Sequence, residues 1–525
     1  MATLVTAAAV RTSRGVLGDA VVIDGIRIAA VGRHADLASR GMDTDSYPGA
    51  TIVPGLRDAH FHPVGYAAAL ARPSLKDAPD LASVADVLRG EAGHTPAGAP
   101  IVALRLDDES LAEGRLPDRA FLDAVVPDHP TLLIRYCGHV AVANGAALEA
   151  AGIGPGTPAP AGGVIDRDDG GAPTGVLRET AIEHVTAALA ELGPPLAPET
   201  VAAAITGLAS VGITGLGGIV SVRQGLWGGG SSELGVLLSA AADLPIPIGV
   251  LVIAADPEEL RDAARRIDGA GGALRFLGLK AFSDGSLGGH TAALVEPYAD
   301  RPDRTGTDRL DPAWAAEMSR CALELGGRVA VHAIGDAANS SVLDVFERLV
   351  ADGADPGMLR IEHASVLSPD DVERMARLGI TAVVQPAFLA SEHEWLEHRL
   401  GPERLLRTYP FRSLRDAGVP LAGSSDCPVE PPSPLHGMAA ARHRAGIVPA
   451  EALRADEALD LFTEWSAAAI GEDAAVGPGS PATFTVLDVD PAEAPPQRLA
   501  TGRALATWVD GRRVEWDRDQ EIWPG

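Results

Sequence analysis

The sequence has few cysteines and a deficit of positive charge, and each shortage excludes a class of protein. Its three cysteines, Cys137, Cys321 and Cys427, are odd in number and widely spaced, so they predict neither a disulfide framework nor a Cys-x-x-Cys metal site. A reducing cytoplasm is therefore the expected location. With 43 Lys and Arg against 71 Asp and Glu, the formal net charge is −28, which argues against nucleic-acid and anionic-membrane partners.

Long apolar runs are also missing. The first residues, MATLVTAAAVRTSRGVLGDAVV, lack a basic start followed by an unbroken apolar core, and no run reaches the ~18 apolar residues of a membrane span. We therefore expect a soluble, unexported protein. At 525 residues and 46% hydrophobic content, the chain can bury a large core and exceeds the usual single domain of ~100 to 200 residues, so we expect at least two domains.

Both ends of the chain predict β-structure. Residues 20–32 (AVVIDGIRIAAVG) place two β-branched runs around Asp-Gly, which is a strong hairpin signal. Residues 482–491 and 504–516 are also strand-like, and the second has its own Asp-Gly turn. Neither end holds enough strands for a stable sheet of its own. We therefore predict one small β-sandwich domain built from residues 1–54 and 466–525.

Residues 55–465 alternate short apolar strands with helical stretches, and the strand that ends at His60 is the first of eight. The others lie at 212–219, 246–254, 274–285, 327–335, 359–367, 380–388 and 419–428. Eight βα units predict an α/β fold with a TIM-like (β/α)8 barrel, whose active site forms at the carboxyl ends of the strands. Residues 66–200 are too long for one connection, so we expect a large insertion after the first barrel strand.

Two histidines stand one residue apart at the end of the first barrel strand, in TIVPGLRDAHFHP (51–63). Side chains at positions i and i+2 project to the same side of a strand, so His60 and His62 can converge on one point. An isolated His-x-His pair is more often a pair of surface or hydrogen-bonded histidines. Their interpretation as chelators therefore depends on partners elsewhere in the chain.

The barrel prediction locates such partners at the ends of later strands. Lys280 ends the fourth strand, His332 the fifth, His363 the sixth and Asp426 the eighth. Imidazole and carboxylate are ligands of Zn²⁺ and similar divalent ions, so polar residues gathered at one barrel end favour a metal site. Taken singly, His332 could be a core histidine, His363 could pair with Glu362, and Asp426 could cap a helix or turn.

Lys280 is the unusual member of this set because it lies in the apolar stretch FLGLKAF. A buried lysine must pair with an acid, lose its charge or be modified. An uncharged amine can react with CO2 to give a carbamate, whose two oxygens could bridge two metal ions.

The motifs DAHFHP, LKAFSDGSLGGHTAAL, VHAIGDAAN, IEHASVL and GSSDCPVEPPSPLHGM together resemble the amidohydrolase superfamily, in particular its YtcJ-like branch, which includes N-substituted formamide deformylases. The resemblance covers nearly the whole chain. It implies a barrel with a split β-sandwich, one or two divalent metal ions, with zinc as the expected metal, and hydrolysis of a carbon-nitrogen bond. It also implies a ligand set: His60, His62 and Asp426 on one metal, His332 and His363 on the other, and a carboxylated Lys280 between them.

The activity that the resemblance implies is hydrolysis of a non-peptide amide, formamide or imide bond in a small molecule by a metal-activated hydroxide, with Asp426 as proton shuttle. The alternatives are a deaminase, a lactone or ester hydrolase on the same barrel, and a catalytically inactive ligand-binding barrel. Lys280 argues against the deaminase, and the complete ligand set argues against the inactive barrel. We expect neither nucleic acid nor membrane as a partner, and the sequence leaves a homodimer open.

Four residues are predicted to contact the substrate: His139 in the insertion, Asp284 and His290 after the fourth strand, and Trp395 after the seventh. Loops at the carboxyl ends of barrel strands often carry specificity. His139, Asp284 and Trp395 also have structural interpretations, as part of the cap, a turn former and a packing anchor, respectively. His290 stands where relatives often have Arg, and the second strand lacks a His-Asp that relatives often carry, so the substrate itself is not predicted.

Overall fold

The computed structural model describes residues 2–38, 42–108, 110–135, 140–160, 163–193, 195–224, 231–518 and 522–523. The chain forms two compact units. The first comprises Met1–Pro63, Ala202–Val220 and Ala240–Ile522, and the second comprises Val64–Val201, Ser221–Ser239 and Trp523–Gly525. All six predicted metal-site residues belong to the first unit.

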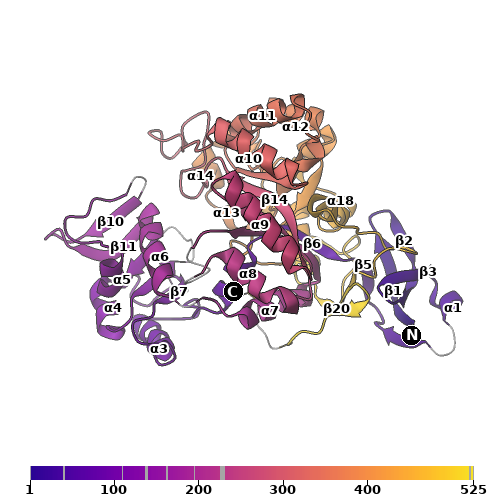
Figure 1. Ribbon diagram of the computed structural model, residues 1–525, viewed down its shortest axis with the longest axis horizontal. Helices are drawn as coiled ribbons and strands as arrows, with labels where there is room; N and C mark the ends of the chain where they lie inside the picture. Colours follow the sequence, from indigo (N-terminus) through magenta and orange to yellow (C-terminus); the bar gives the residue numbers. More distant parts are fainter. Residues whose placement is uncertain are drawn as a thin grey trace. The chain divides into compact units, whose positions relative to one another are not determined.

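Eight strands of the first unit form the barrel (Figure 1). Their order is β6 (Leu56–Phe61), β12 (Ile213–Ser221), β13 (Ile248–Ile253), β14 (Leu274–Phe282), β15 (Arg328–Ala333), β16 (Leu359–His363), β17 (Thr381–Val384) and β18 (Leu421–Gly423). The two edge strands meet where the Asp426 N–H donates to the His60 carbonyl at 3.0 Å and the His62 N–H to the Cys427 carbonyl at 2.9 Å. The predicted (β/α)8 barrel is thereby confirmed.

The helices between barrel strands begin at clear signals. In α9 (Pro257–Ala270), α10 (Pro312–Glu324) and α12 (Pro369–Leu378), the side chains of Asp256, Asp311 and Ser368 accept backbone N–H groups of the first turn. Proline follows each cap, where its missing N–H costs nothing. In α9 the buried residues recur at the spacing of one helix face: Leu260, Ala263, Ala264 and Ile267. These helices therefore cover the strands with one apolar face each.

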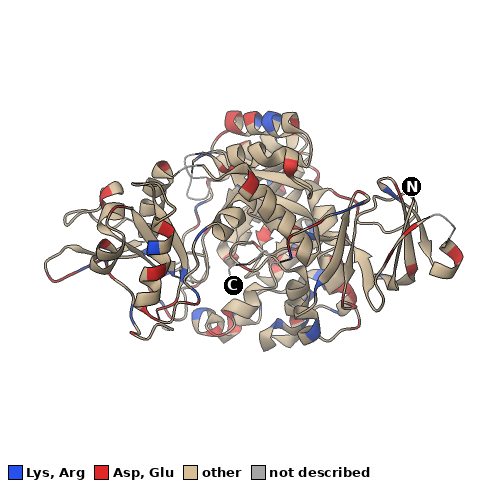
Figure 2. Cartoon of the chain, turned by 90° about the horizontal axis from the view of Figure 1, so that it is seen from below, with Lys and Arg blue, Asp and Glu red and all other residues tan. Residues whose placement is uncertain are grey.

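The remaining helices of the first unit connect strands or support the barrel ends. They are α1 (His34–Leu37), α11 (Asp336–Ala351), α13 (Phe388–Glu392), α14 (Leu396–Leu400), α15 (Pro402–Leu405), α16 (Phe411–Ala417), α17 (Pro434–His443), α18 (Ala455–Leu461), α19 (Glu464–Ile470) and α20 (Pro496–Ala500). No helix in the described part of the chain is both long and apolar enough to cross a lipid bilayer. Figure 2 shows Asp and Glu spread over helices and loops along the chain.

Strands from both chain ends form a single eight-stranded sheet. Its members are β1 (Thr3–Thr12), β2 (Gly15–Asp24), β3 (Arg27–Gly32), β4 (Asp43–Ser46), β5 (Thr51–Pro54), β19 (Phe484–Leu487), β20 (Ala504–Val509) and β21 (Arg512–Arg513). The two ends meet where β19 pairs antiparallel with β5. Asp510 and Gly511, with φ of 46° and 74°, turn the chain between β20 and β21, as the Asp-Gly signal predicted. The sandwich arrangement stays a prediction.

The second unit has its own five-stranded sheet, ordered β10-β11-β9-β8-β7. Its strands are β7 (Ile101–Leu106), β8 (Thr131–Arg135), β9 (Val140–Ala143), β10 (Gly163–Arg167) and β11 (Pro173–Glu179), and its helices include α3 (Leu81–Ala92), α4 (Arg119–Val125), α5 (Gly145–Ala150) and α6 (Thr180–Leu192). Residues 221–239, from the connection between β12 and β13, also belong to this unit. The sequence had assigned that connection to the barrel, because periodicity identifies an element but not the unit it packs with.

Candidate metal centre

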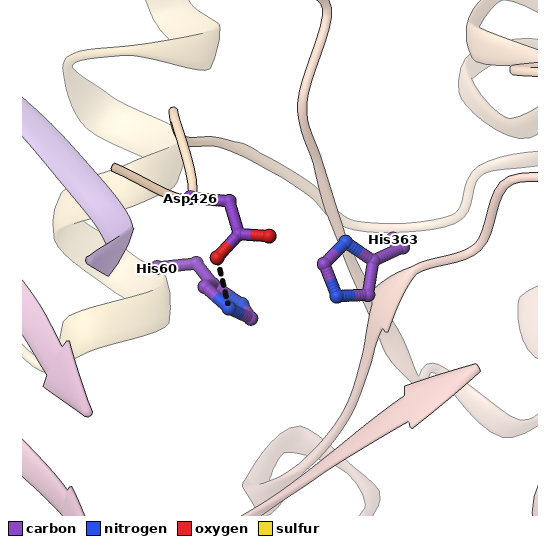
Figure 3. Close-up of side chains that lie close together, drawn as sticks. All are labelled: His60, His363 and Asp426. Carbon is purple, nitrogen blue, oxygen red and sulfur yellow. Dashed lines mark ion pairs between the residues drawn. The ribbon is translucent and has the colours of Figure 1, made fainter. Parts of the chain in front are cut away.

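The residues predicted to bind metal gather at the carboxyl ends of five barrel strands. They are His60 and His62 at the end of β6, Lys280 in β14, His332 in β15, His363 at the end of β16, and Asp426 just after β18. One donor atom each from His60, His363 and Asp426 lies within 4.8 Å of the other two. Figure 3 shows the carboxylate of Asp426 between the two imidazoles. The structure therefore brings residues that are far apart in sequence to one point.

Asp426 joins the histidine pair of the first strand. Its Oδ1 lies 3.1 Å from Nε2 of His60 and 3.1 Å from Nε2 of His62. Burial alone would raise the pKa of Asp426, but His60 and His62 hold that pKa well below its usual range. The carboxylate is therefore ionised, and two imidazoles with one carboxylate make a donor set that suits a divalent cation.

The backbone is strained at two of the proposed ligands. His363, Ala364 and Asp426 have φ values of 73°, 47° and 59°, in the left-handed region that costs residues other than glycine ~1 to 3 kcal/mol each. Neighbouring residues in a regular strand point to opposite faces. Because His363 leaves the extended conformation at the end of β16, its ring can reach the centre that the side chain of Glu362 also approaches. The strained backbone conformation therefore directs a ligand toward the metal centre.

Hydrogen bonds select one nitrogen of His60 and of His363. Nδ1 of His60 lies 2.5 Å from Oε2 of Glu362, and Nδ1 of His363 lies 2.7 Å from Oε1 of Gln385. A carboxylate or amide oxygen only accepts, so each Nδ1 carries a proton and each Nε2 is the nitrogen left for a metal. Glu362 thus pairs with His60, and the predicted alternative in which it pairs with His363 is wrong, because the two adjacent side chains leave the strand in different directions.

His332 contacts protein oxygens through Nε2, whereas His60 and His363 do so through Nδ1. Its Nε2 lies 3.0 Å from the Gly285 carbonyl oxygen and 3.2 Å from Oδ1 of Asp284. Nδ1 is therefore the nitrogen left for a metal. The ring centroids of His332 and His363 are 4.4 Å apart. The two histidines can therefore bind the same ion, one through Nδ1 and the other through Nε2.

Lys280 is buried among these ligands, and no acidic side chain in the described part of the chain forms a salt bridge with it. It is 1% exposed, and its Nζ has no hydrogen-bond partner among the described residues. Its Nζ lies 4.6 Å from the centroid of the Phe282 ring. Burial lowers the pKa of Lys280 to about 8. A fraction of the side chain is therefore an uncharged amine near neutral pH, and its isolation leaves a polar atom to be satisfied by a further group.

Asp58 also belongs to the site, although it is not among the residues predicted from the sequence. Its carboxylate accepts hydrogen bonds from the Ser425 hydroxyl at 2.5 Å, the Ser425 N–H at 3.1 Å and the His60 N–H at 3.2 Å. Burial raises the pKa of Asp58 to about 7. These bonds tie the first barrel strand to the turn that carries Asp426. The available signal was the spacing: Asp58 lies two residues before His60, on the same side of the strand.

Asp284, one of the predicted substrate contacts, accepts several hydrogen bonds from the backbone. Its carboxylate accepts the backbone N–H groups of Ala293, Ile334 and Gly335 at 2.9, 3.0 and 2.8 Å. Together with its contact to His332, these bonds fix the loop after β14 beside the metal ligands. A contact with substrate stays a prediction for this residue.

The other predicted substrate contacts have partners away from the ligands. Nε2 of His290 lies 3.1 Å from the Asp300 carboxylate. The Arg399 guanidinium lies 5.2 Å from the Trp395 ring centroid and forms an ion pair with Asp300, whose Oδ2 is 2.9 Å from Nε of Arg399. This network holds two loops together. His139 lies outside the described residues. Substrate contact stays a prediction for all three residues.

The barrel and its two-histidine, one-carboxylate cluster define the class of a metal-dependent hydrolase. The chain belongs to the Amidohydrolase family, which matches residues 48–515. It is 32% identical to the putative amidohydrolase YtcJ of Bacillus subtilis (strain 168), over 89% of this chain and 90% of that protein. It is 31% identical to the N-substituted formamide deformylase of Arthrobacter pascens, over 95% of each chain.

A solved structure shares the same architecture. An uncharacterized metal-dependent hydrolase from Pyrococcus furiosus is 28% identical and superposes with a TM-score of 0.76, covering 94% of this chain and 100% of its own. The predicted membership of the amidohydrolase superfamily is therefore confirmed. The protein is a metal-dependent hydrolase of that superfamily.

Proposed function

We propose that the protein hydrolyses a carbon-nitrogen bond of the amide, formamide or imide type in a small molecule, with Asp426 as the proton shuttle. The observation that carries this proposal is the buried, ionised Asp426 carboxylate within 3.1 Å of two imidazoles. The similarity to an N-substituted formamide deformylase supports the choice of bond. The net charge of −28 supports a small-molecule substrate rather than nucleic acid.

The donor set supports one or two divalent ions, and zinc suits its nitrogen and oxygen ligands. His60, His62 and Asp426 would hold one ion, and His332 and His363 the other. A divalent ion held there supplies Lewis-acid activation of water and of the substrate carbonyl. The rest of the proposed chemistry belongs to side chains of the chain itself.

Asp426 would move one proton through the reaction. Because its pKa is held low, the carboxylate starts ionised and can accept a proton from the attacking water. It can then give that proton to the departing nitrogen, which leaves as a neutral amine. One residue would thus serve as base and then as acid.

Lys280 would be carboxylated in the form with two ions. Its uncharged amine attacks CO2, a carbon-nitrogen bond forms, and one proton is released, which leaves a carbamate with a single negative charge. The unpartnered Nζ and the pKa of about 8 support this modification. The mass of the intact chain and the ¹³C signal after growth with labelled bicarbonate test it.

The decisive experiment is a substrate screen with the metal-loaded protein. Amides, formamides and cyclic imides are compared with lactones, esters and aminated heterocycles, each with and without a chelator. Chelator-sensitive release of an amine or acid from the first group is expected. Turnover confined to lactones, esters or heterocycles would replace the proposal by an ester hydrolase or a deaminase, and no turnover of any compound would favour a ligand-binding barrel.

The proposal also includes the location of the enzyme, in the cytoplasm, and its oligomeric state. Cys321 and Cys427 are buried free thiols, which supports a reducing cytoplasm. Light scattering during gel filtration distinguishes a monomer from the homodimer that the sequence leaves open.

A further inference from the structure

A buried ion pair lies inside the barrel beside the metal ligands. Arg360 and Glu362 stand two residues apart in β16, so their side chains share one face of the strand. Arg360 is 1% exposed and Glu362 is 0% exposed. Burying two charges costs more free energy than an apolar pair of similar size, so fold stability alone does not explain this pair.

The pair is fully bonded and points at one metal ligand. Nε of Arg360 donates to Oε1 of Glu362 at 2.5 Å, and Nη2 donates to Oε2 at 2.9 Å. The guanidinium also donates to the carbonyl oxygens of Ala59 at 2.7 Å and Ala469 at 3.3 Å. Glu362 is thus held in one orientation, with Oε2 at 2.5 Å from Nδ1 of His60.

The charge state of this carboxyl is also fixed. Both oxygens of Glu362 accept hydrogen bonds from the Arg360 guanidinium, which is always charged and pairs with an ionised carboxylate. An ionised carboxylate accepts hydrogen bonds and cannot donate one. His60 must therefore keep a proton on Nδ1, which leaves Nε2, 3.1 Å from Oδ1 of Asp426, as the nitrogen that faces the metal site.

We propose that Glu362, oriented by Arg360, is a positioning residue that sets the metal affinity of the His60, His62 and Asp426 side of the centre. A carboxylate behind a ligating imidazole fixes the ring and raises its basicity, and the loss of such a partner typically lowers metal affinity by about 10- to 100-fold. At the equivalent place behind His363 stands the neutral amide of Gln385. The imidazoles of His60 and His363 therefore have partners of different charge. This inference rests on the metal centre of the proposed function, but not on its substrate.

The experiment measures zinc affinity by competition with a coloured chelator, and the visible absorption of the cobalt-loaded protein. In Glu362→Gln, one class of site is expected to bind zinc about 10- to 100-fold more weakly, with a changed cobalt spectrum. Because this variant leaves Arg360 buried without its counter-ion, the double variant R360M/E362Q is measured beside it. The double variant removes both charges and is expected to show the same loss.

The matched control is Glu472→Gln. Glu472 pairs with the buried Arg57 at 3.2 Å, so this change also breaks a buried arginine pair, but one that does not contact a metal ligand. It is expected to lower stability and to leave zinc affinity and the cobalt spectrum unchanged.

Parental zinc affinity and an unchanged cobalt spectrum in both Glu362 variants would overturn the inference. ¹⁵N NMR of the unaltered, zinc-loaded protein tests it without any substitution: His60 is expected to show a protonated Nδ1 and a metal-bound Nε2, and the reverse assignment would overturn it. None of these readouts requires turnover. A protein that passes them but cleaves no carbon-nitrogen bond would refute the proposed function alone.

Discussion

The two halves of the metal centre are built differently. The half on β6 and β18 is already connected, because the Asp426 carboxylate contacts both His60 and His62 at 3.1 Å and Glu362 holds His60 from behind. The half on β14, β15 and β16 has two histidines held by oxygen acceptors, and a lysine whose Nζ has no hydrogen-bond partner among the described residues.

This difference shows where the negative charge for a cation comes from. In the first half it is built into the sequence as Asp426 and Glu362, so the site is arranged for a cation by the fold itself. In the second half, the Asp284 carboxylate lies behind His332 at 3.2 Å, and the ligand charge would come from the proposed carbamate of Lys280. We therefore expect the first half to bind metal more tightly than the second.

The largest expected effect is that of removing the metal. A chelator should abolish hydrolysis, and zinc added back should bind in two steps, with the first equivalent held more tightly than the second. Titration calorimetry combined with elemental analysis measures both steps. A single class of equal sites would show that the two halves bind zinc with the same affinity. Full activity of the metal-free protein would refute the proposed function.

The next largest effect is expected for Asp426→Asn. The amide oxygen can still bind a metal, but it cannot carry a proton, so kcat should fall by about 10²- to 10⁴-fold. A substrate with a good leaving group, such as an activated anilide, should lose less because its nitrogen needs little protonation. Metal content is measured in parallel. Equal losses on both substrates that follow loss of metal would make Asp426 a ligand only.

Substitution of Lys280 should affect the second half alone. Lys280→Ala is expected to lower the bound zinc toward one ion per chain and to remove most activity, whereas Lys280→Glu supplies a carboxylate and should keep part of both. Elemental analysis and the turnover rate are the readouts. If Lys280→Ala keeps two ions, the carbamate bridge is wrong.

A smaller effect is expected at Gln385. Gln385→Leu removes the oxygen that accepts the proton of Nδ1 of His363, and loss of such a partner typically costs about 10- to 100-fold in metal affinity. The loss should fall on the second zinc equivalent and spare the first. Weakening of the first equivalent instead would show that the halves are not independent.

The smallest effect is expected at a carboxyl outside both halves. Burial raises the pKa of Glu392 to about 8, although Tyr409 donates a hydrogen bond to it at 2.5 Å. The unfolded chain ionises this group near the ordinary glutamate pKa of 4.5. Its burial therefore lowers the stability of the folded chain increasingly as the pH rises from about 4.5 to about 8.

Glu392→Gln removes that cost. The stability of the variant relative to the parent should therefore improve between pH 5 and pH 8, by about 1 kcal/mol or more. Urea unfolding at both pH values is the measurement. A difference between variant and parent that does not change with pH would show that the Glu392 carboxyl ionises normally in the folded chain.

Much of this architecture is predictable from local pattern. Strand alternation predicted that His60 and His62 share one side of a strand, and the count of βα units predicted which strand ends would carry Lys280, His332 and Asp426. These predictions succeed because parallel barrel strands present all their carboxyl ends at one rim. The pair of Arg360 and Glu362 left a weaker signal, namely opposite charges two residues apart in the buried strand LRIEH, and the sequence analysis did not use it.

The sequence by itself determined the barrel, the joining of the two chain ends in one sheet, and the set of side chains able to bind metal. These features follow from the spacing of apolar residues, from turn residues and from residue type, all of which act locally. Only the tertiary structure decided which nitrogen of His60, His332 and His363 is left for a metal. That choice depends on the acceptor behind each ring, and for His60 the acceptor is Glu362, 302 residues further along the chain. Hydrogen-bond partners at such a separation are set by the closure of the barrel and by the left-handed turn at His363, neither of which has a local pattern.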